Sequence, residues 1–293
     1  MTLSGASTRK GRGLGKATLE LRAAIVAMVR DGRIEPPFTV RQAFYRLTTF
    51  GGVEKSEGGY RRVQRELLRL RREGTIPYRY VTDNTRIRRQ PETYNDLGQA
   101  LRTTARFYRQ ALWRDIAAHV EVWCEKDALA GVIYPETDTY DVPLFCARGY
   151  SSETYAYNAA QEMRASGKPA FVYYFGDFDP SGWDMAENLE CKLREFNPDV
   201  LFERVAVNPE QIRTMNLPER PTKKTDTRHR RFAERFGSDA ASVELDAIEP
   251  SVLRRMVREK IESHIPAGHL ESVEREEAAA RESLEAIAWR WSA

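Results

Sequence analysis

Two different hydrophobic patterns divide the chain. In the N-terminal part, apolar residues recur every three or four positions, as they do on the buried face of an amphipathic helix. This spacing predicts helices over Leu19–Arg30, Val40–Thr49 and Tyr60–Glu73, the second of them capped by Thr39. Ile76–Thr82 alternates in side-chain character and predicts a short strand. Three helices followed by a strand are the outline of a winged helix-turn-helix.

After residue 118 the pattern changes to short apolar runs separated by helical segments. The runs predict strands over Val120–Cys124, Val142–Ala147, Ala170–Phe175 and Phe202–Val207. Helices are predicted over Lys126–Val132, Ser152–Ala165, Ser181–Phe196 and Ser251–His264. Strands that alternate with helices imply a mainly parallel sheet with right-handed crossovers. The predicted fold class is therefore α/β, with a Rossmann-like domain after the winged-helix domain.

These patterns predict five segments along the chain. Residues 1–17, rich in Gly, Ser, Lys and Arg, are expected to be a disordered basic arm, and residues 18–90 the winged-helix domain. Residues 91–118 are expected to be a polar, mostly helical linker, and residues 119–268 the α/β domain. Residues 269–293 are predicted to form an amphipathic helix, which packs either on the body of the protein or on a second subunit.

The net charge of +3 conceals a strong asymmetry. Residues 1–90 contain 20 Lys and Arg against 8 Asp and Glu, a net charge of +12, whereas the rest of the chain carries a net charge of −9. A basic front and an acidic back suggest that one part of the protein binds a polyanion and that another binds a metal ion.

An arginine stripe on the third predicted helix indicates contact with double-stranded DNA. The stripe comprises Arg61, Arg65, Arg69 and Arg72. It lies on a different face from the apolar residues of this helix, so the arginines can reach the phosphate backbone. The alternative is a solvated face neutralised by Glu66 and Glu73, but the excess of arginine favours nucleic acid. Lys223 and Lys224 are further candidate DNA contacts, in the basic stretch Asn208–Gly237 that is predicted to be irregular.

The sequence contains no apolar run as long as a membrane span and no secretory signal pattern. Its three cysteines, Cys124, Cys146 and Cys191, lack metal-ligand spacing and are expected to be reduced thiols. We therefore expect a cytoplasmic protein that associates with the nucleoid through DNA and makes no contact with membrane.

The stretch Ala170–Gly182 carries the main chemical signal. Its apolar start predicts a strand buried on both faces, and Asp177 and Asp179 follow at the carboxyl end of that strand. Side chains two residues apart on an extended backbone point the same way. Ligands bind at the carboxyl ends of strands in α/β sheets, and paired carboxylates there suit Mg²⁺. The alternative is a solvated acidic turn, since Asp, Pro, Ser and Gly all favour turns.

Glu125 closes the first predicted strand of the α/β domain. We expect the order of strands in the sheet to place this strand end close to Asp177 and Asp179. Three carboxylates gathered in this way would repel one another without a cation. The arrangement therefore predicts a three-carboxylate Mg²⁺ site.

Arg41 and Tyr45 are four residues apart on the second predicted helix and therefore share a face. A cation beside a phenol favours the ionised, nucleophilic form of the phenol, and the same guanidinium can hold a phosphate. The alternative is a core tyrosine whose hydroxyl is satisfied by a hydrogen bond.

Together these motifs resemble a known family. Trp123–Lys126 and Gly176–Gly182 look like a Toprim domain, whose signature is a Glu at a strand end and a D-x-D motif. The chain is most similar to the A subunit of topoisomerase VI and its relative, the meiotic DNA double-strand-break protein. Across about residues 20–265, the motifs that carry this similarity are Arg41–Tyr45, Glu125-Lys126, Arg148-Gly149-Tyr150, Asp177–Gly182, Asn208–Ile212, Leu217-Pro218 and Glu244–Ala247.

The resemblance implies a mechanism. Tyr45 would attack a DNA phosphate and form a covalent phosphotyrosyl link, with Arg41 assisting, while Glu125, Asp177 and Asp179 would hold Mg²⁺. Phe44 stands where the family has its first tyrosine, which leaves Tyr45 as the hydroxyl at this site. In the family, the tyrosine of one protomer works with the metal site of the other, so the resemblance also implies a homodimer.

Two other functions remain open at this stage. The protein could be a Toprim nuclease that uses water in place of Tyr45, or a DNA-binding protein whose Toprim domain is structural, although the intact set of three acids argues against the latter. The sequence contains no G-x-x-x-x-G-K-[ST] motif and no ATPase module. Strand passage would therefore need a separate GHKL-type ATPase subunit, and the protein could instead cleave DNA without passing strands.

Overall fold

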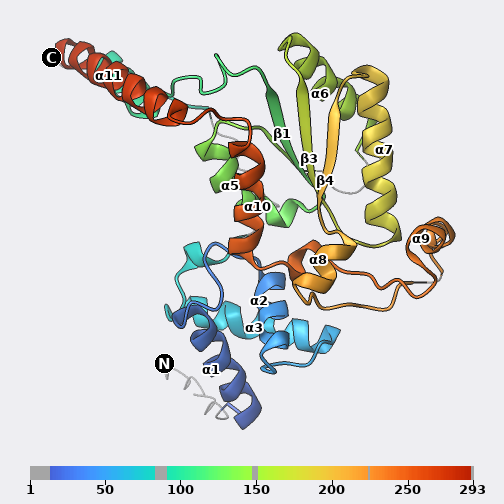
Figure 1. The fold of residues 1–293 in the computed structure, drawn as a ribbon. Helices are drawn as coiled ribbons and strands as arrows, with labels where there is room; N and C mark the ends of the chain where they lie inside the picture. The colour runs from blue at the N-terminus through green and yellow to red at the C-terminus, as the bar shows by residue number, and fades with distance from the viewer. Residues whose placement is uncertain (1–13, 83–90, 147–150, 224, 292–293) are drawn as a thin grey trace, which may run out of the picture.

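The computed structural model describes residues 14–82, 91–146, 151–223 and 225–291. Most of the predicted basic arm, the Arg148-Gly149-Tyr150 motif and Lys224 lie outside these residues. The protein has an α/β fold in which a helical N-terminal part lies beneath a sheet layered with helices (Figure 1). Among the helices described, none has both the length and the apolar character that crossing a membrane requires.

The N-terminal part consists of α1 (Lys16–Arg30), α2 (Val40–Thr49) and α3 (Glu57–Arg72), which confirms the three predicted helices. Thr39 caps α2 by accepting a hydrogen bond from the Gln42 amide. The buried core between the three helices includes Ile25, Phe38, Leu47, Val63 and Leu67.

The predicted strand over Ile76–Thr82 is wrong. Tyr78–Tyr80 is a turn of 3₁₀ helix instead, and only an isolated bridge joins Val81 to Phe38. The reason is that the apparent alternation does not separate a buried face from a solvated one. Ile76 is buried, whereas the Tyr78 ring is 56% exposed and lies beside the Arg71 guanidinium. Two backbone hydrogen bonds with Phe38, from its amide to the Tyr80 carbonyl and from the Thr82 amide to its carbonyl, hold this segment together with the contact between Arg71 and Tyr78.

The sheet contains β1 (His119–Cys124), β2 (Leu144–Cys146), β3 (Ala170–Phe175) and β4 (Leu201–Ala206). Over the described part of the chain, its order is β2-β1-β3-β4 and every pairing is parallel, which confirms the predicted parallel sheet. Helices cover both faces, as expected for parallel strands (Figure 1). They are α5 (Ala130–Thr139) and α10 (Pro250–Glu262) on one face and α6 (Glu153–Ala165) and α7 (Pro180–Phe196) on the other.

The stretch 208–237 was expected to be irregular, but it contains α8 (Pro209–Thr214) and α9 (His229–Phe236). Asn208 starts α8 with a capping box to Gln211, a signal that the high basic charge of the stretch obscured. The α9 helix packs against α7, where Phe232 and Phe236 meet the ring systems of Phe178 and Trp183.

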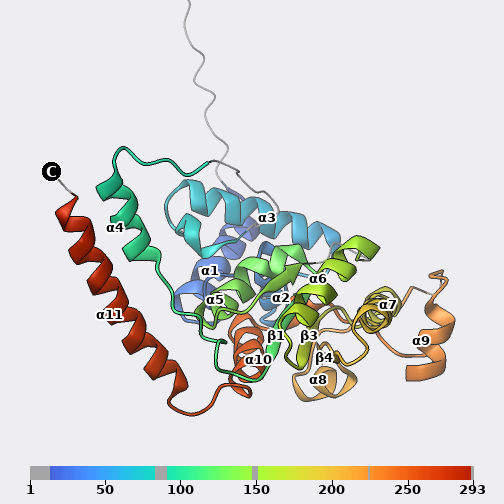
Figure 2. The ribbon, with the colours of Figure 1, turned by 90° about the horizontal axis from the view of Figure 1, so that it is seen from above.

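The remaining helices, α4 (Leu97–Phe107) and α11 (His269–Arg290), lie side by side and form an arm that projects from the body (Figure 2). The C-terminal helix therefore packs on an element of its own chain. At the outer end of α11, Ile287 is 45% exposed and Trp291 is 60% exposed, so the described part of the chain leaves this end of the helix uncovered. Within residues 91–118, the helix is confined to α4.

Candidate functional site

The two predicted acidic strand ends lie next to each other. Strands β1 and β3 pair with Cys124 opposite Phe175, so Glu125 and Gly176 leave the sheet side by side. The Glu125 amide donates to the Phe175 carbonyl at 2.8 Å, and Oε2 of Glu125 accepts a hydrogen bond from the Asp177 amide, also at 2.8 Å. The expected proximity of these strand ends is confirmed.

Two glycines make room for the Glu125 carboxylate. A Cβ atom at Gly176 would lie 2.7 Å from its Oε2, and one at Gly182 would lie 2.9 Å from the same oxygen. At Gly182 the added carbon would also come within 2.5 Å of the Asp177 carbonyl oxygen. At Gly176 the added carbon would also come within 2.5 Å of the Tyr174 ring, so close packing around the Glu125 carboxylate explains both glycines of the Gly176–Gly182 motif.

The three acids have different environments. Burial, followed by the negative charge of Asp177, raises the pKa of Glu125 to about 7. Burial also raises the pKa of Asp177, although Lys126 opposes this. Asp179 instead caps α7, accepting a hydrogen bond from the Gly182 amide at 2.7 Å.

The carboxylates of Glu125, Asp177 and Asp179 are chemically suited to Mg²⁺, but the three side chains do not already form a metal site. Within the ranges that the structure describes, no three His, Cys, Asp or Glu side chains form a group able to hold a metal ion. Mg²⁺ usually takes only one or two protein carboxylates and completes its shell with water and phosphate oxygens. Glu125 and Asp177 are two such carboxylates, and a cation would offset both the burial and the repulsion by Asp177 that raise the Glu125 pKa.

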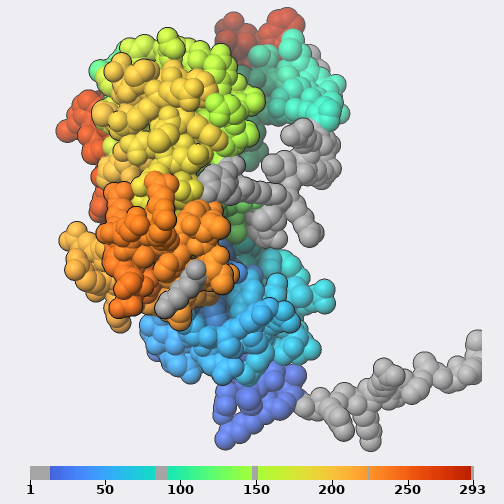
Figure 3. All heavy atoms as spheres, turned by 90° about the vertical axis from the view of Figure 1, so that its right-hand side faces the viewer, coloured from blue at the N-terminus to red at the C-terminus, as the bar shows by residue number. Residues whose placement is uncertain are grey.

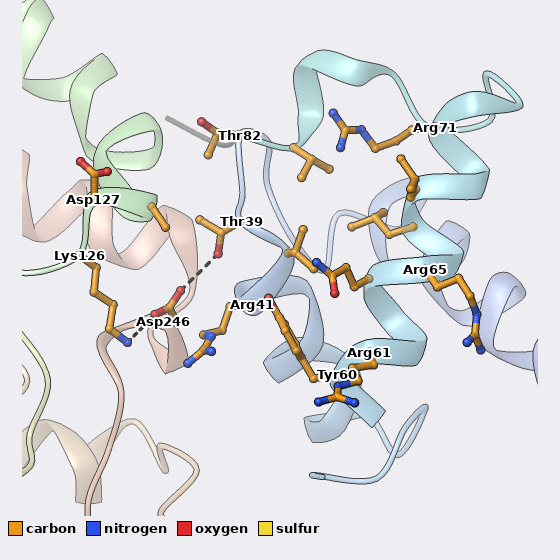
Figure 4. Close-up of a pocket in the computed structure, with 16 residues that line it drawn as sticks. Thr39, Arg41, Tyr60, Arg61, Arg65, Arg71, Thr82, Lys126, Asp127 and Asp246 are labelled. Carbon is orange, nitrogen blue, oxygen red and sulfur yellow. Dashed lines mark hydrogen bonds and ion pairs between the residues drawn. The ribbon is translucent and has the colours of Figure 1, made fainter. Parts of the chain in front are cut away.

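Lys126 connects these acids to the N-terminal domain, a role that sequence reasoning missed. Its Nζ lies 2.9 Å from Oδ1 of Asp177, 2.7 Å from Oδ2 of Asp246 and 3.4 Å from Oε2 of Glu244. Burial alone would lower the Lys126 pKa, but the three carboxylates outweigh it and raise the pKa. Figure 4 shows the Lys126 side chain reaching Asp246, which also contacts Thr39 of the N-terminal domain.

The acids opposite Lys126 come from a segment that folds back onto the D-x-D turn. Val243 pairs with Phe178 in an antiparallel bridge, and the Leu245 amide donates to Oδ1 of Asp177 at 2.7 Å. A 3₁₀ turn, Leu245–Ala247, then carries Asp246. The sequence signal for this segment was the motif Glu244–Ala247, which gave no hint of an ionic partner.

Arg204 is a second, half-buried cation that sequence reasoning missed. It lies within β4, and its guanidinium donates to the main-chain carbonyls of Gly176, Asp177 and Gly182. Burial lowers its pKa. Arg204 thus fixes the backbone that surrounds the Glu125 carboxylate.

Arg41 and Tyr45 lie on α2 at the interface with the α/β domain. Arg41 Nη1 is 2.6 Å from Oε2 of Glu244, and the Arg220 guanidinium carbon lies 5.4 Å from the centre of the Tyr45 ring. Tyr45 is only 2% exposed. No hydrogen bond joins its hydroxyl to another residue for which the structure gives a position.

Arg41 acts on Tyr45 in the expected direction, because its charge lowers the Tyr45 pKa, but other effects outweigh it. Burial, together with the nearby Glu244 carboxylate, raises the Tyr45 pKa and outweighs the opposing effects of Arg220, Lys126 and Arg41. Arg41 is already paired with Glu244, so its charge is largely neutralised before it acts on the phenol.

The arginine stripe divides between a groove and the surface of α3. A groove of about 790 Å³ lies between the N-terminal domain and the loop after β1, and Arg61 and Arg65 line it together with Arg41 and Lys126 (Figure 4). Arg69 does not line the groove but pairs with the buried Glu66 at 3.1 Å.

Acidic partners neutralise part of the arginine stripe. Arg65 reaches Glu66 at 3.2 Å, as expected for a solvated face on which Glu66 and Glu73 balance the arginines. Glu73, by contrast, pairs with Arg22 of α1. Arg72 and Lys223 are exposed and do not line the groove.

Comparison with known proteins adds no assignment, since no protein-family model matches the sequence and no curated protein is significantly similar to it. The functional argument therefore depends on the chemistry of the site.

Proposed function

We propose that this protein cleaves the DNA backbone in an Mg²⁺-dependent reaction in which Tyr45 is the nucleophile, as in the topoisomerase VI A-subunit family that its sequence resembles. In this proposal, the N-terminal helices act as the winged-helix domain and the sheet domain as a Toprim domain. One observation carries it: a single ionic cluster joins the sheet-edge acids to the surroundings of Tyr45. Lys126 contacts both Asp177 and Glu244, and Glu244 contacts Arg41.

The residues of the chain have distinct roles in this proposal. Glu125 and Asp177 would hold Mg²⁺, with Asp179 beside them, and the metal ion would supply charge stabilisation to the phosphate. Arg41 and Lys126 line the groove where it meets the acids, and both are paired with carboxylates that an entering phosphate would have to displace. Arg61 and Arg65 on the opposite wall bind the DNA backbone and so orient it toward the cluster.

A second function, a Toprim nuclease that uses water, is favoured by one specific observation. Tyr45 is 2% exposed and its pKa is raised, so the phenol is not activated in this state. The tyrosine mechanism therefore requires the interface between the two domains to open when DNA binds. A homodimer and a separate GHKL-type ATPase subunit are further proposals, which follow from the resemblance.

The proposed Mg²⁺ site at the sheet edge is tested by cleavage of supercoiled plasmid. We expect nicked or linear DNA to form with Mg²⁺ and not with EDTA. We expect Asp177→Asn to slow cleavage roughly 10²–10³-fold, because it removes a charge that holds the metal ion on the reacting phosphate. Asp184→Asn is the matched control, since Asp184 lies on α7 and pairs with Arg231 away from the cluster. Equal activity of wild-type protein and Asp177→Asn would exclude the proposed Mg²⁺ site.

DNA binding by the groove can be measured separately from cleavage. We expect the double variant Arg61→Gln/Arg65→Gln to weaken binding of a short duplex in EDTA and to reduce the slope of log K against log salt by about 0.9 for each phosphate that the variant no longer neutralises. The control is Arg194→Gln/Arg255→Gln, which removes two half-exposed arginines of α7 and α10. A slope that the first pair leaves unchanged would place the DNA on another face.

A further inference from the structure

Glu244 is surrounded by cations from three distant parts of the chain. Its Oε2 lies 2.6 Å from Arg41 Nη1 on α2 and 3.4 Å from Lys126 Nζ after β1, and its Oε1 is bonded to Arg220 Nη1. The Glu244 side chain is only 15% exposed. One carboxylate thus accepts from two guanidinium groups and an ammonium group, the donor set that proteins also use to bind a phosphate.

The Glu244 carboxylate neutralises part of the charge of these three cations and so allows them to lie close together. Burial by itself would raise the Glu244 pKa, but Lys126, Arg41 and Arg220 lower it to about 2. If the carboxylate moved away, Asp246 and Asp177 would still balance Lys126, but neither guanidinium group would keep its partner. An anion entering from outside would then be strongly favoured.

The cluster is open to solvent on the side of the two arginines. The side chains of Arg41 and Arg220 are 42% and 40% exposed. They line a cavity of about 540 Å³, next to the main groove, whose wall also includes Lys55 and Tyr60. Burial and the nearby Arg220 lower the Lys55 pKa, as expected for a fourth cation close to the others. Figure 3 shows the orange segment after β4, on which Arg220 lies, directly against the blue N-terminal helices.

We propose that Arg41, Lys126 and Arg220 form a binding site for a phosphodiester group, and that the Glu244 carboxylate occupies this site until DNA displaces it. Glu244 is then an internal competitor. Its departure would also remove a negative charge that raises the Tyr45 pKa and release one of the contacts between α2 and the sheet domain. The choice of DNA as the ligand rests on the proposed function, whereas the anion site and its occupation by Glu244 do not.

Calorimetric titration of Glu244→Gln tests this proposal. We expect the variant to bind inorganic phosphate and a dinucleotide with one phosphodiester at least about tenfold more tightly than wild-type protein, because the competing charge is gone. Both titrations are made in EDTA at fixed ionic strength, in a Tyr45→Phe background. The control, Glu203→Gln, removes an acid of β4 that pairs with Lys260 of α10 and makes no contact with Arg41, Lys126 or Arg220 among the described residues, so this variant should bind neither ligand more tightly.

The outcomes separate the parts of the proposal. Unchanged affinity of Glu244→Gln for both ligands overturns it, and a gain for inorganic phosphate alone overturns the assignment to DNA. If Glu244→Gln does not fold, Glu244→Asp keeps the charge on a side chain one methylene shorter, which cannot span both guanidinium groups; a gain in affinity supports the site and no gain overturns it. Because neither metal ion nor Tyr45 is needed, a failure of cleavage would leave the anion site untouched, and the reverse also holds.

Discussion

Tyr45→Phe is expected to abolish the covalent protein–DNA adduct and to reduce DNA cleavage roughly 10⁴-fold or more, since it removes the attacking oxygen. The variant should fold normally, because the ring stays buried and the hydroxyl makes no hydrogen bond to any residue that the structure describes. The measurement is incubation with labelled plasmid and Mg²⁺, denaturation, and detection of label that migrates with the protein.

Tyr80→Phe is the control for the loss of a tyrosine hydroxyl. Tyr80→Phe removes a hydroxyl from the same N-terminal domain and should leave adduct formation intact, since Tyr80 does not line the groove. If Tyr45→Phe cleaves DNA at the wild-type rate while Asp177→Asn does not, water is the nucleophile and the protein is a Toprim nuclease.

Mixing the two defective variants distinguishes a site built within one chain from a site shared by two. In a dimer that pairs the tyrosine of one protomer with the acids of the other, Tyr45→Phe mixed with Asp177→Asn regains one intact site, and nicking of one strand returns. In a site built within one chain, every site carries a defect and the mixture stays inactive. The contact between Lys126 and both Glu244 and Asp177 of the same chain favours the second result.

Lys126→Met is expected to destabilise the protein by roughly 3–5 kcal/mol, because it leaves buried carboxylates without their shared cation. The carboxylate of Asp246 is 2% exposed and that of Asp177 is 12% exposed, so neither is well hydrated. The decrease in the free energy of unfolding can be measured by urea denaturation followed by circular dichroism.

The matched comparison is Lys260→Met, which removes a lysine that pairs with Glu203 at the surface. That change should cost only about 0–1 kcal/mol, as exposed ion pairs usually do. Equal decreases for the two variants would mean that the Lys126 cluster is hydrated rather than buried.

Local patterns predicted most of the fold. The apolar run Ala170–Phe175 and the cap residue Thr39 are signals that act within a few residues, and the elements they predict are present. The parallel sheet brings the carboxyl ends of β1 and β3 to the same edge, and the expected order of strands placed Glu125 close to Asp177, as observed. The strand predicted over Ile76–Thr82 is absent, because alternation of residue types does not show which side chains will be buried.

The ionic cluster could not be predicted in this way. Arg41 and Glu244 are 203 residues apart, and their contact depends on how the N-terminal helices dock on the sheet domain. Nothing in the local sequence around Lys126 distinguishes a buried lysine from a solvated one. The same holds for Tyr45, which belongs to the core of the N-terminal helices and also contacts Arg220 from a segment far away in the sequence.

The arm of α4 and α11 has a consequence for biosynthesis. Residues on α4 and the turn after it find their partners about 170 positions later, as in the contact between the Tyr108 carbonyl and Arg281. At a translation rate of about 5–20 residues per second, α4 leaves the ribosome roughly ten seconds or more before the helix that covers it. The sheet strands are all synthesised during that interval, so the nascent chain completes its central layer first and closes the arm last.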